Sequence, residues 1–146
     1  MKTYRIILVL IGSFLVGCAG TNNSGKNKQE LEAANHINIA DSLLIKSLLR
    51  KAANEYLFIA KQYSTTKYYP EAVRKTAILY CNPQNPVTDD STSLYWYHVY
   101  LTLPISDQEK ENTNSCIMLL ERIKSLREEL QKLREVDVQM NKKEIK

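Results

Sequence analysis

The sequence predicts an all-α protein, a small helical bundle with a long C-terminal helix that carries a heptad seam. Apolar residues recur at steps of three and four over most of the chain, and no two segments alternate in a way that would pair them as strands. All four glycines lie within the first 25 residues. Because phosphate-binding loops and tight hairpins need glycine, this distribution also excludes the common nucleotide-binding sites.

Residues 1–17 are predicted to be a signal peptide. Lys2 and Arg5 precede an apolar run over residues 6–16. This run is shorter than the roughly 20 residues that a membrane-spanning helix needs, so it fits an export signal better than a permanent span. The signal also supplies part of the formal net charge of +4. Acidic and basic side chains are interleaved over the remaining chain without a basic block, so no nucleic-acid partner is expected.

The residues Leu15-Val16-Gly17-Cys18 closely resemble the lipobox of bacterial lipoproteins. The resemblance implies cleavage between Gly17 and Cys18 and acylation of the Cys18 thiol. Several acyl chains on one residue hold a protein at a bilayer far more firmly than a single chain does. Ala19, rather than Asp, follows the cysteine, which by the same resemblance implies sorting to the outer membrane with the protein facing the periplasm.

A tether and a helical domain are expected after the anchor. Residues 18–29 are polar and lack apolar periodicity, which predicts a lipidated cysteine followed by a flexible tether. Residues 30–146 form the predicted helical periplasmic domain. Its first part, up to Tyr63, contains neither proline nor glycine and has an amphipathic pattern. Asp41 is a candidate cap for a second helix after a break near Asn38.

Prolines divide the middle of the domain. Pro70 suits the first turn of a helix that continues to Cys81, and the two prolines within residues 82–86 end that helix. Residues 93–103 fit either a strand or a helix. A helix is favoured, because an isolated strand is not stable and no second strand is available. Asp89-Asp90-Ser91 forms a plausible capping loop before it.

The last helix is predicted to begin near Asp107, because Ser106 and Glu109 have the spacing of a capping box. Its apolar residues step alternately by three and four. They define the heptad seam, which Asp137 interrupts once: Cys116, Leu119, Ile123, Leu126, Leu130, Leu133, Asp137 and Met140. Two arrangements remain open. The seam packs against the domain's own helices, or its C-terminal half projects as a coiled coil, which includes self-association.

The sequence offers little catalytic chemistry. His36 and His98 have no cysteine or carboxylate at metal-ligand spacing, and Asp89 and Asp90 are adjacent rather than facing each other across a substrate. We therefore expect no catalytic residue, no metal, no cofactor and no enzymatic activity; a cell-wall enzyme is the least favoured alternative.

Two further sets of residues are candidates for structural or binding roles. Cys81 and Cys116 are either a disulfide, which an oxidising periplasm favours, or buried free thiols. The candidate partner-binding residues combine aromatic and leucine side chains: Trp96, Tyr97, Tyr100, Leu126, Leu130 and Leu133. Aromatic clusters with polar tips are common at interfaces and equally common in cores, and leucine seams suit helix-in-groove or coiled-coil pairing.

Several short motifs resemble the QseG (YfhG) family of enterobacterial outer-membrane lipoproteins. They are Arg74-Lys75-Thr76-Ala77 leading to Cys81, Asp89-Asp90-Ser91 before the aromatic helix, Ile105-Ser106 with Glu109, and Leu119-Leu120-Glu121-Arg122-Ile123. The resemblance covers about the C-terminal half of the chain and the lipobox. It implies a non-enzymatic accessory of two-component signalling that engages the sensor domain of a histidine kinase. The alternative is a pilotin-like lipoprotein that escorts subunits of a secretion or pilus system.

Overall fold

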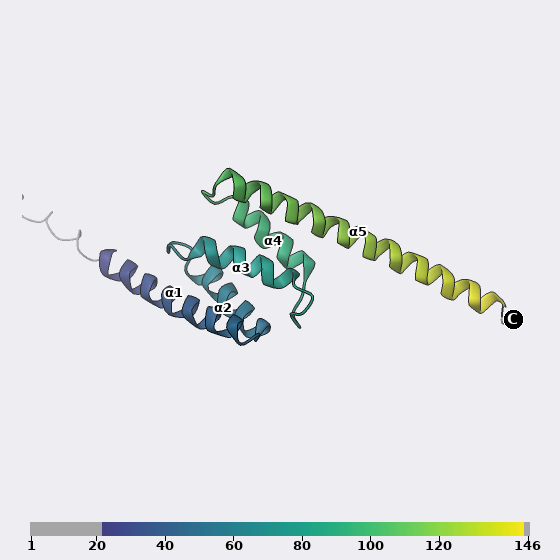
Figure 1. Cartoon of the computed structure of the whole chain (residues 1–146), viewed down its shortest axis with the longest axis horizontal. Helices are drawn as coiled ribbons and strands as arrows, with labels where there is room; N and C mark the ends of the chain where they lie inside the picture. Colours follow the sequence, from purple (N-terminus) through teal and green to yellow (C-terminus); the bar gives the residue numbers. More distant parts are fainter. Residues whose placement is uncertain (1–21, 145–146) are drawn as a thin grey trace, which may run out of the picture.

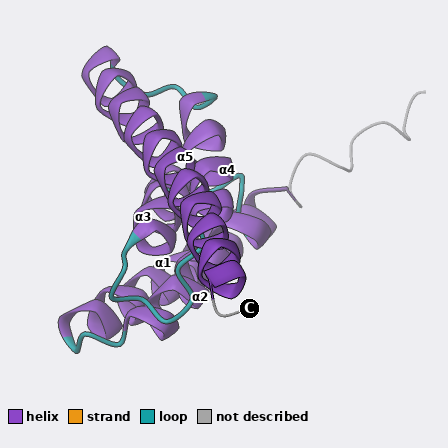
Figure 2. Cartoon of the chain, turned by 90° about the vertical axis from the view of Figure 1, so that its right-hand side faces the viewer, coloured by secondary structure: helices purple, strands orange, loops and turns teal. Residues whose placement is uncertain are grey.

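A computed structural model describes residues 22–144 as five helices and their connecting loops. The helices are α1 (Asn22–Ile45), α2 (Leu49–Gln62), α3 (Tyr69–Cys81), α4 (Asp90–Leu101) and α5 (Asp107–Glu144). This described part contains no strand, which confirms the predicted all-α class (Figure 2). Consecutive helices pack on one another, and α5 extends well beyond the other four (Figure 1). The predicted signal peptide, Gly17 and Cys18 lie outside the described residues.

The helix α1 begins earlier than expected. Residues 22–29, predicted to be part of a flexible tether, are helical, and the side chains of residues 24–29 are exposed. The buried contact of α1 is a narrow line of Ala33, Ile37 and Ala40. Polar contacts to the loop after α2 also hold this end, since the backbone N–H of Lys67 donates to Glu30 Oε1 at 3.1 Å. The polar composition of this segment therefore marks an exposed helix rather than a flexible linker.

The break between the first two helices is at residues 46–48, not near Asn38. Ser47 has φ of 57°, in the left-handed region. Its N–H donates to the Leu44 carbonyl at 2.8 Å, and the Leu48 N–H donates to the Leu43 carbonyl at 2.9 Å. These two bonds form a Schellman motif, which ends α1. The predicted capping role of Asp41 is wrong, because this residue lies inside α1 and accepts a hydrogen bond from the Tyr56 hydroxyl.

The later helix boundaries agree with the sequence. Pro70 lies in the first turn of α3. The Asp89 side chain caps α4 by accepting a hydrogen bond from the Ser91 N–H at 3.0 Å, and residues 90–101 are helical, so the helix reading of this segment is confirmed. The capping box of α5 is also present. The Ser106 N–H donates to Glu109 Oε2 at 3.0 Å, and the Glu109 N–H donates back to Ser106 Oγ at 3.3 Å.

The core is centred on α2, α3 and α4. Tyr56, Ile59 and Val73 are fully buried there. Buried polar groups are paired with backbone, as when Ser93 Oγ donates to the Ala77 carbonyl at 2.8 Å and so ties α4 to α3. The four shorter helices form a compact base from which α5 projects.

Within the part of the chain that the structure describes, no helix has both the length and the apolarity needed to span a membrane.

Candidate interaction surface

The first part of α5 is attached to the bundle along one face. Thr113, Ile117 and Leu120 are 5%, 7% and 7% exposed, and their spacing of four and three residues places them on one side of the helix. The Thr113 hydroxyl donates to the Glu109 carbonyl at 2.7 Å, so it is satisfied within the helix. This short line, together with Cys116, the first member of the heptad seam, makes the apolar contact between α5 and the bundle.

An ion pair continues this contact toward the C-terminus. Arg127 Nη1 bonds to Asp90 Oδ2 at the start of α4. The Asp90 side chain is 14% exposed, which shows that the charge is largely shielded from water. The neighbouring Asp89 has a pKa below its usual value, first because the Thr92 hydroxyl bonds to it and, in smaller measure, because Lys124 lies nearby. Both carboxylates of the Asp89-Asp90 pair therefore have structural roles.

The heptad seam faces solvent. Its apolar members from Leu119 onward are 41–64% exposed, whereas a packed seam would be buried: Leu119 64%, Ile123 41%, Leu126 46%, Leu130 48%, Leu133 63% and Met140 53%. At 100° per residue, the seam is centred roughly 120° around the helix from the buried line of Thr113, Ile117 and Leu120. From Leu119 onward the seam therefore does not pack against the described helices of the domain, and its C-terminal half projects from the bundle.

The free part of α5 is long enough to serve as a docking element. Nearly every side chain from Glu121 to Met140 is exposed. The helix continues to Glu144, so the part beyond the Arg127–Asp90 ion pair is roughly 25 Å long at 1.5 Å per residue (Figure 1). Its exposed leucines, which include the predicted partner-binding residues Leu126, Leu130 and Leu133, form one continuous apolar stripe.

The aromatic half of the predicted partner-binding set is not available at the surface. Trp96, Tyr97 and Tyr100 are only 6%, 5% and 3% exposed. The Tyr100 hydroxyl donates to Glu109 Oε1 at 2.8 Å, so its polar tip is used within the chain. These rings fill the space between α4 and its neighbours, so the prediction that they face a partner is wrong. Among the tryptophan and tyrosine side chains of α4, only Tyr95 is exposed, at 60%.

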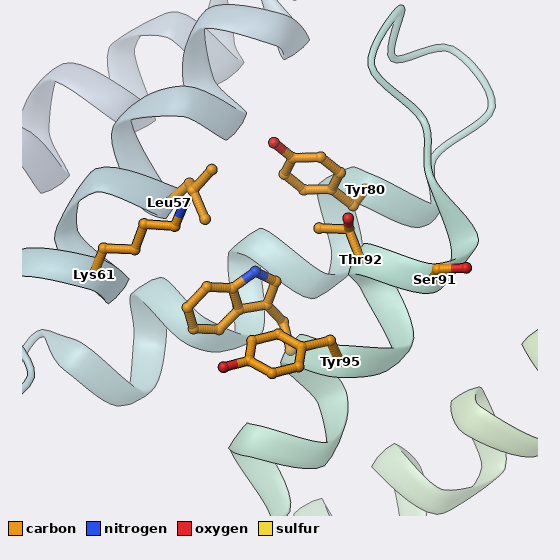
Figure 3. A pocket seen from close by; sticks show the side chains of 7 residues that line it. Leu57, Lys61, Tyr80, Ser91, Thr92 and Tyr95 are labelled. Carbon is orange, nitrogen blue, oxygen red and sulfur yellow. The ribbon is translucent and has the colours of Figure 1, made fainter.

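An open pocket of about 460 Å³ lies between α2 and the α3–α4 corner (Figure 3). It is lined by Leu57, Lys61, Tyr80, Ser91, Thr92, Tyr95 and Trp96. In Figure 3 the Lys61 and Leu57 side chains lie across the pocket from Tyr80 and Thr92. Lys61 is the one charged side chain of this lining, and the remaining polar groups are hydroxyls and the indole N–H. This set of groups can hold a small polar molecule but includes no carboxylate or imidazole for acid–base chemistry.

Of the two alternatives for Cys81 and Cys116, the structure has free thiols, and both are partly buried. Both lie close to the hydroxyl of Tyr97, whose pKa is raised first by burial and then by these two neighbours. The thiols thus occupy the junction of α3, α4 and α5, where they fill space beside a buried phenol.

The histidines differ from each other in their surroundings. His36 Nδ1 lies 2.7 Å from Glu55 Oε2. The His36 ring packs at a tilt against the Phe58 ring, and the two ring centroids are 4.6 Å apart. His98 is exposed on α4. No group of three or more histidine, cysteine, aspartate or glutamate side chains that could hold a metal occurs among residues 22–144. The contact between His36 and Glu55 links α1 to α2, a pairing of distant residues that the sequence spacing did not indicate.

Comparison of the chain with protein-family models, curated proteins and solved structures found no match. The geometry of α5 and the N-terminal sequence are therefore the main grounds for assigning a function.

Proposed function

We propose that this chain is a non-enzymatic interaction protein of the bacterial cell envelope, anchored to a membrane by a lipid on Cys18, and that α5 is its docking element. The observation that carries the proposal is the exposed heptad seam on the projecting part of α5. Contiguous apolar patches of this kind on soluble domains commonly mark interaction sites. The regular spacing of three and four residues indicates what the patch binds, because it suits knobs-into-holes packing against another helix.

The energetics of a free helix support a helical partner. An isolated helix is only marginally stable in water, and most helical stability in proteins comes from packing an apolar face. Among the described residues, α5 has no such packing between residues 121 and 140. A partner helix lying along Leu126, Leu130 and Leu133 would bury the exposed half of each side chain. Docking would then stabilise the helix and the complex together.

The N-terminal sequence supports an envelope location. The charged start, apolar run and lipobox occur in the order and spacing of a lipoprotein signal, and Ala19 is the basis for placing the chain at the outer membrane. The resemblance to the QseG family makes the sensor domain of a histidine kinase the proposed partner. We propose no catalytic role, because the sequence offers no nucleophile paired with a base.

The experiment that tests this proposal compares two variants in intact cells. One has Leu126, Leu130 and Leu133 replaced by serine, which removes the centre of the seam. The matched control has Met118 and Val138 replaced by serine, because these residues are 69% and 52% exposed on the same helix but lie outside the seam. Envelope proteins that co-purify with each variant after chemical crosslinking are identified by mass spectrometry, and circular dichroism verifies that both variants remain helical.

The seam variant is expected to lose its partner while the control retains it. Loss of a histidine kinase supports the signalling role, whereas loss of a secretion or pilus subunit would replace it with the pilotin-like role. A seam variant that retains every partner of the unmodified chain would contradict the proposal that α5 is the docking element.

A further inference from the structure

Basic residues outnumber acidic residues in the positions that flank the heptad seam. With Ile123 at position a and Leu126 at position d of a heptad, the flanking e and g positions from residue 122 to residue 134 hold charged residues: Arg122, Arg127, Glu129 and Arg134. The next g position holds Val136. The e and g residues of a coiled coil lie beside the partner's apolar stripe and determine which partner and which orientation are accepted. Three of these four positions are therefore basic.

Contacts within the described part of the chain leave Arg134 as the unpaired charge among these four residues. Glu129 Oε1 lies 3.9 Å from Arg122 Nη1 and also accepts a hydrogen bond from the Ser125 hydroxyl at 3.1 Å. Arg127 is held by Asp90 of α4. Arg134 has no ion pair within the described residues and is exposed. The acidic flanking residue is thus partly neutralised, and the C-terminal half of the seam presents a free positive charge.

Pairing of the seam with a second copy of itself brings like charges together in several registers. In a parallel register, Arg122 lies against Arg127 of the second copy and Asp137 lies against Asp137, while only Glu129 against Arg134 attracts. In an antiparallel arrangement e faces e and g faces g, so one register brings Arg127 against Arg134, whereas another brings Arg122 against Glu129. Because like charges placed in contact act against a pairing, the parallel register and the antiparallel register that joins Arg127 to Arg134 are disfavoured.

We infer that the partner of α5 is an amphipathic helix whose apolar heptad stripe is flanked by Asp and Glu, with a Lys or Arg in the core position that meets Asp137. This inference rests on the proposed function and specifies the chemistry of its partner. Acidic flanks pair with Arg122 and Arg134, and a basic core residue neutralises Asp137, which otherwise loses hydration without compensation. Since the flanking charges are exposed, the selectivity weakens as salt is added.

The test uses two synthetic helical peptides and the full chain in detergent micelles. Both peptides have Ile at a and Leu at d, with one Lys at the a position that meets Asp137. The first has Glu at every e and g position, and the second has Lys there. Binding of each fluorescently labelled peptide is measured by anisotropy at low and high salt. The acidic peptide is expected to bind about ten-fold tighter than the basic one, and the difference is expected to shrink at high salt.

A charge-reversal variant provides the matched control. Replacing Arg122 and Arg134 by glutamate keeps the apolar seam and is expected to reverse the preference between the two peptides. Equal binding of both peptides, or tighter binding of the basic one by the unmodified chain, would overturn the inference. So would a chain that dimerises through α5, measured by sedimentation, more tightly than it binds the acidic peptide.

The remaining outcomes separate this inference from the proposed function. If neither peptide binds but the serine variant of the seam still loses its crosslinked partner in cells, the inferred charge chemistry is wrong and the docking role of α5 stands. If neither peptide binds and the serine variant keeps every crosslinked partner of the unmodified chain, the inferred charge chemistry and the docking role of α5 are both wrong.

Discussion

Ile117 and Ile123 form a matched pair that tests how α5 is attached. Both are isoleucines on the same helix, six positions apart, yet Ile117 is 7% exposed and Ile123 is 41% exposed. Ile123 is also absent from the residues that pack against the core. Replacing each by alanine makes the same chemical change in two environments, so any difference in the free energy of unfolding reports the packing alone.

The expected magnitudes differ clearly. Removing a buried isoleucine side chain costs about 2–5 kcal/mol, through lost transfer energy and the cavity that remains. At Ile123 the removed atoms contact mainly their own helix and water, and alanine has a higher helix propensity by a few tenths of a kcal/mol. We therefore expect Ile123→Ala to cost less than about 1 kcal/mol, since a fully buried apolar side chain contributes about 1.5–3 kcal/mol.

Urea and thermal unfolding measure both variants. For a domain of this size a loss of 1 kcal/mol lowers Tm by about 4 °C, so Ile117→Ala should lower it by roughly 8–20 °C and Ile123→Ala by less than about 4 °C. The measurement is made at a concentration at which the chain is monomeric, so that no partner covers the seam. Equal losses in the two variants would refute the reasoning, because they would show that the seam is packed within the folded chain.

Three further predictions concern helix ends. Ser47→Gly is expected to raise the free energy of unfolding by about 0.5–1 kcal/mol, because glycine accepts the left-handed conformation without a Cβ clash; a lower urea midpoint for the variant would contradict this. Asp89→Ala is expected to lower stability by about 1 kcal/mol, since the cap of α4 is lost, whereas Asp89→Ser should retain most of it. The pKa of Glu109 is lowered to about 2, first by the Ser106 hydroxyl, then by the Ser106 N–H and the Tyr100 hydroxyl. Because the folded pKa lies below the unfolded one, the contribution of Glu109 is complete above about pH 4.5 and is lost as the pH falls toward 2. Glu109→Gln should therefore flatten the decline in the urea midpoint over this range, and a decline as steep as in the unmodified chain would count against the assignment.

Helix boundaries were predictable where the chain has distinctive residues. Prolines mark the start of α3 and the loop after it, and the Ser106 and Glu109 pair marks the start of α5. The end of α1 has no such mark. A Schellman motif normally takes glycine, and here Ser47 adopts the left-handed conformation instead. The local sequence therefore did not show the turn.

The role of the aromatic residues could have been inferred from helical spacing. Ser93, Trp96, Tyr97 and Tyr100 follow the steps of three, one and three residues that place side chains on one helix face, and all four are buried. The polar tips of tyrosine suggested an exposed surface, but the hydroxyl of Tyr100 is satisfied by a carboxylate within the chain. On a short helix, the face that an aromatic residue occupies therefore predicts its burial better than the polar atom that it carries.

The seam was visible in the sequence, but its environment was not. Periodicity shows that residues share a face and does not show what covers that face. On α5 two lines run side by side, and the shorter one, with the polar Thr113, makes the contact with the bundle. The long regular seam remains free because it lies on a different side of α5 from the line that contacts the bundle, and because α5 extends well beyond the other helices (Figure 1). Only the three-dimensional arrangement distinguishes the two lines.

Site-specific photo-crosslinking from α5 in intact cells tests the central claim most directly. A photoreactive amino acid is placed at Leu130, in the middle of the seam, or at Lys132, which is exposed on the opposite side of the same helix turn. The docking role of the seam predicts a covalent adduct with a partner protein from position 130 and none from position 132. Adducts of equal yield from both positions, or none from position 130, would contradict it.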